Sequence, residues 1–412
     1  MITILFLLPD NPYYYSAAVS NRWLTYIKSF LTLGVSVKLV ILDGFLSIEE
    51  KNDFRNNKDK NPNIIYISTC RQYNGCLRKL FHIAKYLYLF DVMRTIKIKR
   101  LLKKEKPDFV FFGCFITREL NISAIAKKTN CKLILEASEF EDISRPNALF
   151  RKIEYIIHLK RFYSLLPHIT LFTIMTKTLC QHYEELTGQK GNIIHIPMTV
   201  DLSRFDKTSI KTAELKEMPK PYIAYCGSLS NKKDGLSILI KSFAAFHKHY
   251  PQYHLCLAGR DHPDVNGQKE LIKSLNVHDN IHYIGMLDQS VIPEFLCNAT
   301  ICVLARPRSH QAEGGFPTKL GEYLASGNPV CVTKTGEIAD YLQDGVSAFL
   351  AEPDSVDSFT NALCRAASDL NHAEIVGKIG RNVAENNFNM NIHVNRLLNR
   401  LETILTTEEH NS

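Results

Sequence analysis

The chain has 412 residues, of which 45% are hydrophobic and 22% charged, and its formal net charge is +8. This length is too great for one ordinary hydrophobic core, so we expect two domains. The composition is typical of a soluble globular protein, and no stretch approaches the roughly 20 apolar residues of a membrane-spanning helix.

In chain order, apolar strand-like segments alternate with helical segments, a pattern that favours parallel sheets covered by helices. The predicted strands are Ile2–Leu8, Val35–Leu42, Ile64–Ser68, Phe109–Phe112, Lys132–Leu135, Thr170–Ile174, Asn192–Ile196, Tyr222–Cys226, His254–Ala258, Ile281–Ile284, Ile301–Leu304 and Pro329–Thr333. The predicted helices are Ala17–Leu33, Leu77–Lys104, Glu119–Lys128, Ala148–Leu165, Lys177–Leu186, Leu236–His249, Gln268–Leu275, Val291–Asn298, Thr318–Ser326, Ile338–Gln343 and a long region, Val356–Leu405, broken near Asn386.

The alternation occurs twice, separated by a polar, lysine-rich stretch that contains Pro219 and Pro221. Such a stretch is typical of a linker. We therefore predict an N-terminal domain over 1–206, a linker over 207–220 and a C-terminal domain over 221–387. Because ligands of open α/β sheets bind beyond the carboxyl ends of the strands, each domain is expected to present its polar loops there.

The segment 71–106 carries eleven Lys or Arg residues and only two acids, Asp91 and Glu105. Apolar residues are interleaved with the cations, so one interpretation is a basic amphipathic helix on an anionic membrane surface. The alternative is a connecting helix whose apolar side packs on its sheet and whose basic side faces solvent. Nucleic-acid binding is not expected, because no recognition module accompanies the basic patch.

Eleven cysteines are scattered along the chain without a Cys-x-x-Cys pair, and several lie in apolar runs. This usage predicts buried, reduced thiols in a cytoplasmic protein and no metal site.

The run from Glu313 to Val330 contains two glycines, a proline, and then a short helical segment that ends at Gly327 and Pro329. Pro317 suits the first turn of that helix, and a helix start after a glycine-rich turn can bind a phosphate through its free N–H groups. Lys319 and Glu322 lie three residues apart on one helical face. One can meet a phosphate, and the other can accept hydrogen bonds from a pair of sugar hydroxyls.

A second motif runs from the strand Tyr222–Cys226 through Gly227 to Lys232 and Lys233. Glycine lets the backbone approach a ligand closely, and the lysines add cationic charge. The alternative for the lysines is a solvated turn.

These two motifs resemble the donor site of the family 4 glycosyltransferases, also called glycosyl transferases group 1. The resemblance implies the GT-B fold, in which two Rossmann-like domains face each other across a cleft, and it implies that the stretch after Phe388 packs on the first domain. It is strongest from about Tyr222 to Ala351 and covers the first half mainly through layout. It also implies transfer of a sugar, with retention at the anomeric carbon, from a UDP- or GDP-linked donor to a glycan or lipid-linked acceptor. No cofactor and no metal are implied.

By this resemblance Glu322 contacts the ribose of the donor, while Lys233, Lys319 and the helix start stabilise the leaving diphosphate. A first glutamate usually lies eight residues before the second, but Gly314 occupies that position and the nearest acid is Glu313. The catalytic residues it implies are thus Glu313, Lys319 and Lys233. The full set of nucleotide-sugar-binding residues comprises Gly227, Ser228, Lys233, Arg260, Met286, Phe316, Pro317, Thr318, Lys319 and Glu322.

Some of these positions depart from the family pattern or have a simpler explanation. Ser228 stands where relatives carry an arginine, so it contributes a hydroxyl but no charge. Arg260 faces either the diphosphate or solvent, and the backbone near Met286 is expected to contact the base.

The acceptor-side residues are expected in the first domain, where Tyr15 and Ser16 follow the first strand and Glu136 and Glu139 end a later one. A buried acid there would have a raised pKa suited to proton transfer, but acids at a helix start are the alternative explanation. Two other functions remain open: a sugar-nucleotide epimerase of the same fold, and a non-catalytic partner subunit that binds sugar nucleotides.

Overall fold

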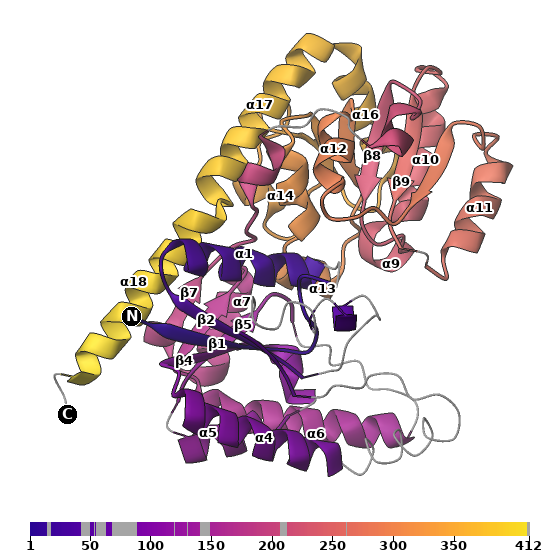
Figure 1. The fold of residues 1–412 in the computed structure, drawn as a ribbon. Helices are drawn as coiled ribbons and strands as arrows, with labels where there is room; N and C mark the ends of the chain where they lie inside the picture. The colour runs from indigo at the N-terminus through magenta and orange to yellow at the C-terminus, as the bar shows by residue number, and fades with distance from the viewer. Residues whose placement is uncertain are drawn as a thin grey trace. The chain divides into compact units, whose positions relative to one another are not determined.

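The computed structural model of the chain describes residues 1–14, 18–42, 50–52, 54, 63–67, 89–118, 120–129, 131–140, 149–206, 212–260 and 262–409. It divides into two compact units. The first comprises Met1–Ile196 and Val394–Ser412, and the second comprises Pro197–His393. Figure 1 shows that each unit has a sheet flanked by helices.

The first unit contains a seven-stranded parallel sheet in the order β3-β2-β1-β4-β5-β6-β7. Its strands are β1 (Thr3–Leu8), β2 (Ser36–Ile41), β3 (Ile64–Tyr66), β4 (Phe109–Gly113), β5 (Lys132–Ala137), β6 (Leu171–Ile174) and β7 (Ile193–His195). Its helices are α1 (Ala18–Thr32), α4 (Leu89–Glu105), α5 (Ile122–Thr129), α6 (Leu149–Leu165), α7 (Lys177–Thr187) and most of α18 (Met390–Glu409), with short 3₁₀ turns η1 (Cys114–Arg118), η2 (Leu166–His168) and η3 (Lys190–Asn192).

Both faces of this sheet are buried, because successive residues of a strand point to opposite sides. Leu5 and Leu7 of β1 belong to a core cluster with residues of α4, α5, α6 and α7. Ile4 and Phe6 belong to a second cluster, which includes α1 and the residues Val394–Leu401 of α18. The C-terminal helix therefore completes the hydrophobic core of the first unit.

The second unit contains a six-stranded parallel sheet in the order β10-β9-β8-β11-β12-β13. Its strands are β8 (Tyr222–Cys226), β9 (His254–Ala258), β10 (Ile281–Gly285), β11 (Ile301–Leu304), β12 (Val330–Thr333) and β13 (Phe349–Ala351). Its helices are η4 (Leu202–Phe205), α8 (Ala213–Lys216), α9 (Asn231–Asp234), α10 (Leu236–His247), α11 (Val265–Ser274), α12 (Ile292–Cys297), α13 (His310–Gly314), α14 (Thr318–Ala325), α15 (Ile338–Tyr341), α16 (Val356–Ser368) and α17 (Leu370–Asn387).

Each of the twelve predicted strands is confirmed, with ends that differ by no more than two residues. The pattern missed β13, which is only three residues long, and the single-turn helices α9 and α13. It also missed the break between α16 and α17 at Asp369, whose side chain accepts a hydrogen bond from the His372 N–H and so caps α17. Segments this short contain too few residues to show a hydrophobic period.

The boundary between the units follows Ile196, so residues 197–206, which we predicted in the first domain, lie in the second unit. Part of the predicted linker forms α8. Residues 77–88 of the predicted helix Leu77–Lys104 and the acceptor-side residues Tyr15 and Ser16 lie outside the described residues.

Candidate functional site

Three neighbouring strands of the second unit, β8, β9 and β10, end in or are followed by glycines at their carboxyl ends. The Gly227 N–H donates to the Ala258 carbonyl at 2.9 Å, and the Gly259 N–H donates to the Gly285 carbonyl at 2.8 Å. A Cβ atom on Gly259 would lie 2.0 Å from the Gly227 carbonyl oxygen, so only glycine fits. The absence of side chains leaves the backbone accessible at the sheet edge where ligands of this architecture bind.

Lys319, from the first turn of α14, lies directly beside Gly227. A Cβ atom on Gly227 would be only 2.5 Å from Lys319 Nζ. Nζ forms an ion pair with Asp234 Oδ2 at 2.6 Å and lies 5.3 Å from the centre of the Tyr225 ring. The side chain of Lys319 is 14% exposed and that of Asp234 only 3%. The sequence did not indicate Asp234 as the partner of this lysine.

Burial lowers the pKa of the Lys319 ammonium, and Asp234 opposes this effect. The positive charges of Lys233 and Arg306 lower the pKa of Lys319 further. Lys319 thus lies at the glycine edge with a buried carboxylate partner, and the exposed Lys233 lies in the neighbouring turn α9. This arrangement favours an anionic ligand with more than one negative charge.

Lys233 lies in α9, the single turn of helix between β8 and α10, and its side chain is exposed. Ser230 caps this turn by accepting a hydrogen bond from the Lys233 N–H at 3.3 Å. Gly235 ends it with a φ of 69°. A Cβ atom there would lie 2.0 Å from the Ala305 carbonyl oxygen, which fixes the turn against the end of β11.

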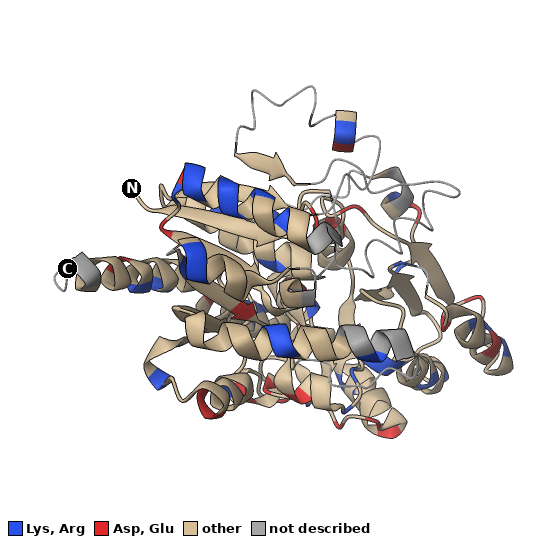
Figure 2. Cartoon of the chain, turned by 90° about the horizontal axis from the view of Figure 1, so that it is seen from below, with Lys and Arg blue, Asp and Glu red and all other residues tan. Residues whose placement is uncertain are grey.

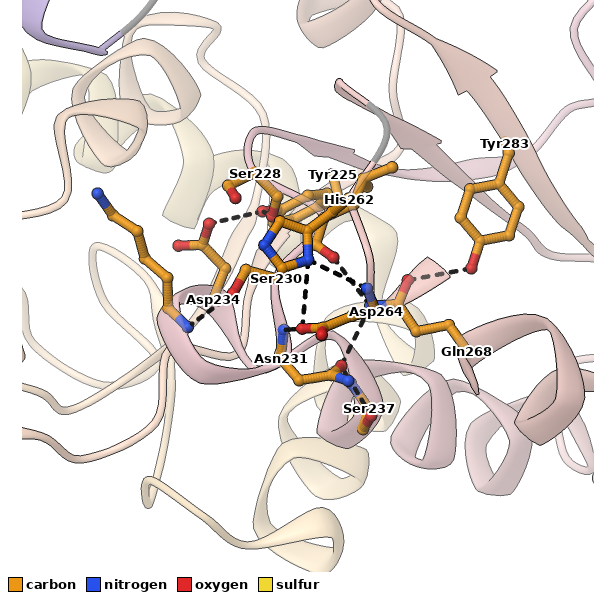
Figure 3. A network of polar contacts seen from close by, with 12 residues as sticks. Tyr225, Ser228, Ser230, Asn231, Asp234, Ser237, His262, Asp264, Gln268 and Tyr283 are labelled. Atoms are coloured by element: carbon orange, nitrogen blue, oxygen red, sulfur yellow. Dashed lines mark hydrogen bonds and ion pairs between the residues drawn. The ribbon is translucent and has the colours of Figure 1, made fainter. Parts of the chain in front are cut away.

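A polar network centred on Asn231 links this turn to the starts of α10 and α11 (Figure 3). The Asn231 side-chain oxygen accepts from the Ser237 hydroxyl at 2.7 Å and from Gln268 Nε2 at 3.1 Å. The Asn231 N–H donates to Asp264 Oδ2 at 2.7 Å, and Gln268 also donates to the Leu229 carbonyl at 2.9 Å. Sequence reasoning missed these residues, because most of the partners lie more than 30 positions apart in the chain.

Glu322 lies one turn after Lys319 on α14 and pairs with Arg204 of η4, with Nη1 2.7 Å from Oε1. The next residue, Tyr323, is buried and fixes α14 to the end of β8. Its hydroxyl accepts from the Cys226 N–H at 2.8 Å and donates to the Cys226 carbonyl at 3.0 Å. The α14 residues predicted to bind the donor are thereby held next to Gly227.

The start of α14 is formed by Pro317, which has an extended φ of −72° and ψ of 109° and cannot cap the helix with a side-chain hydrogen bond. The partly buried Thr318 begins the helix. Phe316, predicted to contact the donor, is 5% exposed and packs against Tyr341 and Phe388, with ring centres 5.6 and 5.3 Å away. Its side chain anchors the helix start in the core.

Arg306, which follows β11, is a residue that the motif analysis missed. It is 5% exposed and donates to the carbonyl oxygens of Gln311 and Gly315, at 3.3 and 3.4 Å. It therefore supports the glycine-rich turn from α13 into α14. Glu313 lies in α13 with an exposed side chain, in a turn capped by Ser309.

The other predicted donor-binding residues lie at the same carboxyl edge of the sheet. Ser228 follows Gly227, and its carbonyl accepts a hydrogen bond from the Tyr225 hydroxyl. Arg260 and Met286 follow β9 and β10, and both side chains are exposed. The Met286 side chain is 60% exposed, which makes it available to a planar ligand.

In the first unit, the predicted acceptor-side residue Glu136 is buried at the end of β5 and pairs with Arg22 of α1 at 2.5 Å. Arg22 also donates to the Tyr26 hydroxyl at 3.0 Å and to the Ile196 carbonyl at 2.9 Å. Burial raises the pKa of the Glu136 carboxyl, while Arg22 acts in the opposite direction. The Glu136 carboxylate is thus engaged in the interior, whereas Glu139 is exposed.

Three general properties concern the part of the chain that the structure describes. Within it, no three His, Cys, Asp or Glu side chains are placed to hold a metal ion together. Also within it, no helix combines the length and apolar character needed to cross a membrane. The nine cysteines of the described ranges are all free thiols.

Comparison with known proteins places this site in a wider context. A model of the family described as glycosyl transferases group 1 matches residues 206–383. The uncharacterized glycosyltransferase MJ1059 of Methanocaldococcus jannaschii is 26% identical over 263 residues, which are 61% of this chain and 62% of that protein. The alignment therefore spans less than two thirds of the archaeal relative.

A second relative is the GDP-mannose-dependent alpha-(1-6)-phosphatidylinositol monomannoside mannosyltransferase of Mycolicibacterium smegmatis. It is 20% identical over 300 residues, which are 71% of this chain and 75% of that protein. Among solved structures, Anabaena Alr3699/HepE in complex with UDP superimposes with a TM-score of 0.70 at 15% identity, covering 98% of this chain and all of that one. This last likeness concerns the fold.

Proposed function

We propose that the chain transfers a sugar from a nucleotide-diphosphate donor to an acceptor, on the premise that residues 206–383 match the glycosyl transferases group 1 family and that the fold is GT-B. The observation that carries the proposal is the direct apposition of Lys319 and Gly227, where a Cβ atom would lie 2.5 Å from Nζ. A lysine ammonium beside the glycine that follows a strand is suited to a phosphate that binds close to the backbone.

The proposed donor lies along the carboxyl edge of the second sheet. Its diphosphate contacts Gly227, Lys233, Lys319 and the N–H groups at the start of α14, since a helix N-terminus and cations both stabilise negative charge. Its ribose contacts Glu322, because a carboxylate accepts hydrogen bonds from two hydroxyls. The exposed Met286, after β10, contacts the base.

The proposed chemistry needs stabilisation of the leaving diphosphate. As the bond between the anomeric carbon and the phosphate oxygen breaks, negative charge grows on the diphosphate. Lys319 is held by its ion pair with Asp234 and the helix start by the backbone, so both favour the transition state with little reorganisation, and the exposed Lys233 adds a further positive charge. We propose retention at the anomeric carbon and no metal requirement, with Glu313 as the acid beside the transferred sugar.

The first test is nucleotide binding by the full chain. UDP, GDP and ADP and their sugar conjugates are screened by thermal shift, since a ligand that binds only the folded state raises its apparent stability. The binding nucleotide is then titrated by calorimetry. Glu322→Ala is expected to weaken binding about 10- to 100-fold, because hydrogen bonds to a charged group contribute about 1.5–3 kcal/mol.

Glu270→Ala is the matched control, since Glu270 is an exposed acid on α11 of the same unit. Equal affinity in the Glu322 and Glu270 variants would refute the assignment of the site. Incubation with donor alone, followed by analysis of the sugar, separates a transferase from an epimerase. The anomeric configuration of the transferred sugar tests retention, and activity in the presence of a chelator tests metal independence.

For the acceptor, we propose a glycan or lipid-linked molecule of surface polysaccharide or glycan biosynthesis, with the enzyme at the cytoplasmic face of the membrane. The name of the Mycolicibacterium relative, which refers to a phosphatidylinositol mannoside, supports this proposal. In the described part of the basic segment, α4 exposes Val92, Met93 and Ile96, at 57%, 57% and 44%. Apolar residues beside cations are typical of helices that lie on anionic membranes.

The cations near this helix lie in α4 and α5, directly after α4 and at the start of β5, and the two helices lie next to α6 on one side of the first sheet (Figures 1 and 2). Lys103, Lys106, Lys127, Lys128 and Lys132 border one open hollow of about 970 Å³ at the starts of β5 and β6. This clustering of cations on one layer of the unit is the charge distribution expected for contact with anionic lipid.

Sedimentation with phosphatidylserine vesicles tests this membrane contact. A variant with Gln in place of Arg100, Lys103, Lys127 and Lys128 is expected to sediment less, by roughly 1 kcal/mol for each cation removed. A control variant of equal charge carries Gln at four exposed lysines of the second unit, at positions 241, 248, 273 and 378. Equal loss in both variants would show non-specific attraction and remove the membrane proposal.

A further inference from the structure

Arg204 connects two parts of the proposed donor site through one guanidinium group. Nη1 donates to Glu322 Oε1 at 2.7 Å, and Nη2 donates to the Gln289 carbonyl oxygen at 2.6 Å. Gln289 lies in the loop that begins with Met286 after β10. A single side chain of η4 thus ties the carboxylate of α14 to the loop proposed to contact the base.

The Arg204–Glu322 pair is only partly buried, with side chains 21% and 13% exposed. Its charges also reach the end of β8. The pKa of the Cys226 thiol is raised to about 12, first by burial and then by Glu322, while Lys319 and Arg204 oppose the rise. The end of β8 is held against α14 by geometry as well, since Tyr323 bonds both backbone groups of Cys226 and Lys319 lies beside Gly227.

This geometry leaves Glu322 with capacity for a ligand. A carboxylate has two oxygens with about four acceptor positions. The hydrogen bond from Arg204 Nη1 uses one of the positions on Oε1. The guanidinium is planar and makes two directed hydrogen bonds here, so it restricts the orientation of the carboxylate. A side chain that is already oriented loses less conformational freedom when a ligand binds.

We propose that Arg204 is a positioning residue that orients Glu322 toward a vicinal diol, namely the ribose of a ribonucleoside diphosphate. The proposal rests on the proposed function, because it assumes that the donor nucleotide binds at the edge of β8, β9 and β10. Arg204 acts through Glu322 and not by its own contact with the ribose. Its second hydrogen bond, to the loop after β10, keeps the residues that contact the ribose and the base at a fixed distance from each other.

The experiment measures recognition of the ribose and not affinity alone. The full chain is titrated by calorimetry with the tightest binder among UDP, GDP and ADP, and with the 2′-deoxy form of the same nucleotide. The wild type is expected to prefer the ribonucleotide by about tenfold or more. Arg204→Met is expected to lose most of this preference while it still binds the diphosphate. Arg204→Lys should keep only part of this preference, since an ammonium lacks the planar set of donors of a guanidinium.

Two controls separate positioning from general damage. Arg396→Met removes an exposed arginine of α18, outside the proposed site, and should leave the preference unchanged. In a Glu322→Gln background, Arg204→Met should change the preference by less than twofold, because the two residues act as one unit. Thermal unfolding of each variant identifies any that fail to fold.

Each outcome decides between the alternatives. Arg204→Met could weaken the binding of the ribonucleotide and of its 2′-deoxy form equally, or weaken the binding of neither. In either case Arg204 does not position Glu322 for the ribose, and the inference is wrong. If the wild type binds none of the three diphosphates, the proposed function fails instead, independently of Arg204.

Discussion

Each unit of the molecule contains an arginine–glutamate pair close to the carboxyl edge of its sheet, and the two pairs differ in burial. Arg22 and Glu136 of the first unit have side chains only 4% and 6% exposed. Arg204 and Glu322 of the second unit are 21% and 13% exposed. In both cases the arginine makes further hydrogen bonds, to the Ile196 carbonyl in one unit and to the Gln289 carbonyl in the other.

The difference in exposure indicates different roles for chemically identical pairs. A fully buried carboxylate is expensive to leave without its partner, so the first pair is suited to maintaining the structure. A partly exposed pair contributes little to stability but keeps its polar atoms accessible to a ligand. We therefore expect the first pair to determine folding and the second to determine binding.

The largest expected effect comes from Arg22→Met, which leaves Glu136 buried without its cation. We expect the free energy of unfolding to fall by about 3–5 kcal/mol, the range observed when one partner of a buried pair is removed. Urea denaturation followed by circular dichroism measures this loss. The double variant Arg22→Met with Glu136→Met should recover much of it, because an apolar pair of similar volume avoids the buried charge.

Arg204→Met is the matched variant in the second unit, and its expected cost in stability is about 1 kcal/mol or less. A loss as large as that of Arg22→Met would remove the proposed distinction between the two pairs. So would an Arg22→Met variant with wild-type stability.

The next largest effect is expected at Gly227, where an added side chain would collide with the end of the Lys319 side chain. In Gly227→Ala the new methyl group would meet Lys319 Nζ at 2.5 Å and the Tyr225 hydroxyl at 2.9 Å. The end of the Lys319 side chain must move away from Gly227, so nucleotide affinity should fall by about 1.5–3 kcal/mol, the contribution of one hydrogen bond to a charged group. Calorimetric titration measures this. Gly267→Ala on α11, where a methyl group would meet nothing within 4 Å, is the control.

The smallest expected effect is a pH dependence from Lys319. Its pKa in the folded state lies below the ordinary 10.5, mainly because of burial. The ammonium is therefore lost at a lower pH than in an exposed lysine, and nucleotide affinity should decline as pH rises through a range below 10.5. Lys319→Arg stays charged there and should keep its affinity. Parallel declines in both proteins would assign the effect to another group.

The same shift has a defined effect on stability. Between the folded and unfolded pKa values of Lys319, the unfolded chain binds more protons than the folded one, so this group makes the folded state more stable as pH rises. Affinity and this contribution to stability therefore change in opposite directions over the same range. That opposition distinguishes titration of Lys319 from general alkaline unfolding.

The amino-acid sequence alone was sufficient to predict twelve of the thirteen described strands, most helices, and the places of Gly227 after a strand and of Lys319 at a helix start. These features depend on local chemistry: apolar runs form strands, Pro317 and Gly327 delimit α14, and Gly227 follows a buried strand. The two-domain architecture followed from the repeated alternation of strands and helices. The assignment of Lys319 and Glu322 to one helical face also needed only their spacing.

The pairing of charges was decided by the tertiary structure. Glu322 pairs with a residue 118 positions away, and Glu136 with one 114 positions away. Phe316 resembled a ligand contact in the motif but packs into an aromatic cluster. The physical reason is that hydrogen bonds and burial depend on which segments meet in space, and a local pattern carries no information about partners more than a hundred residues away.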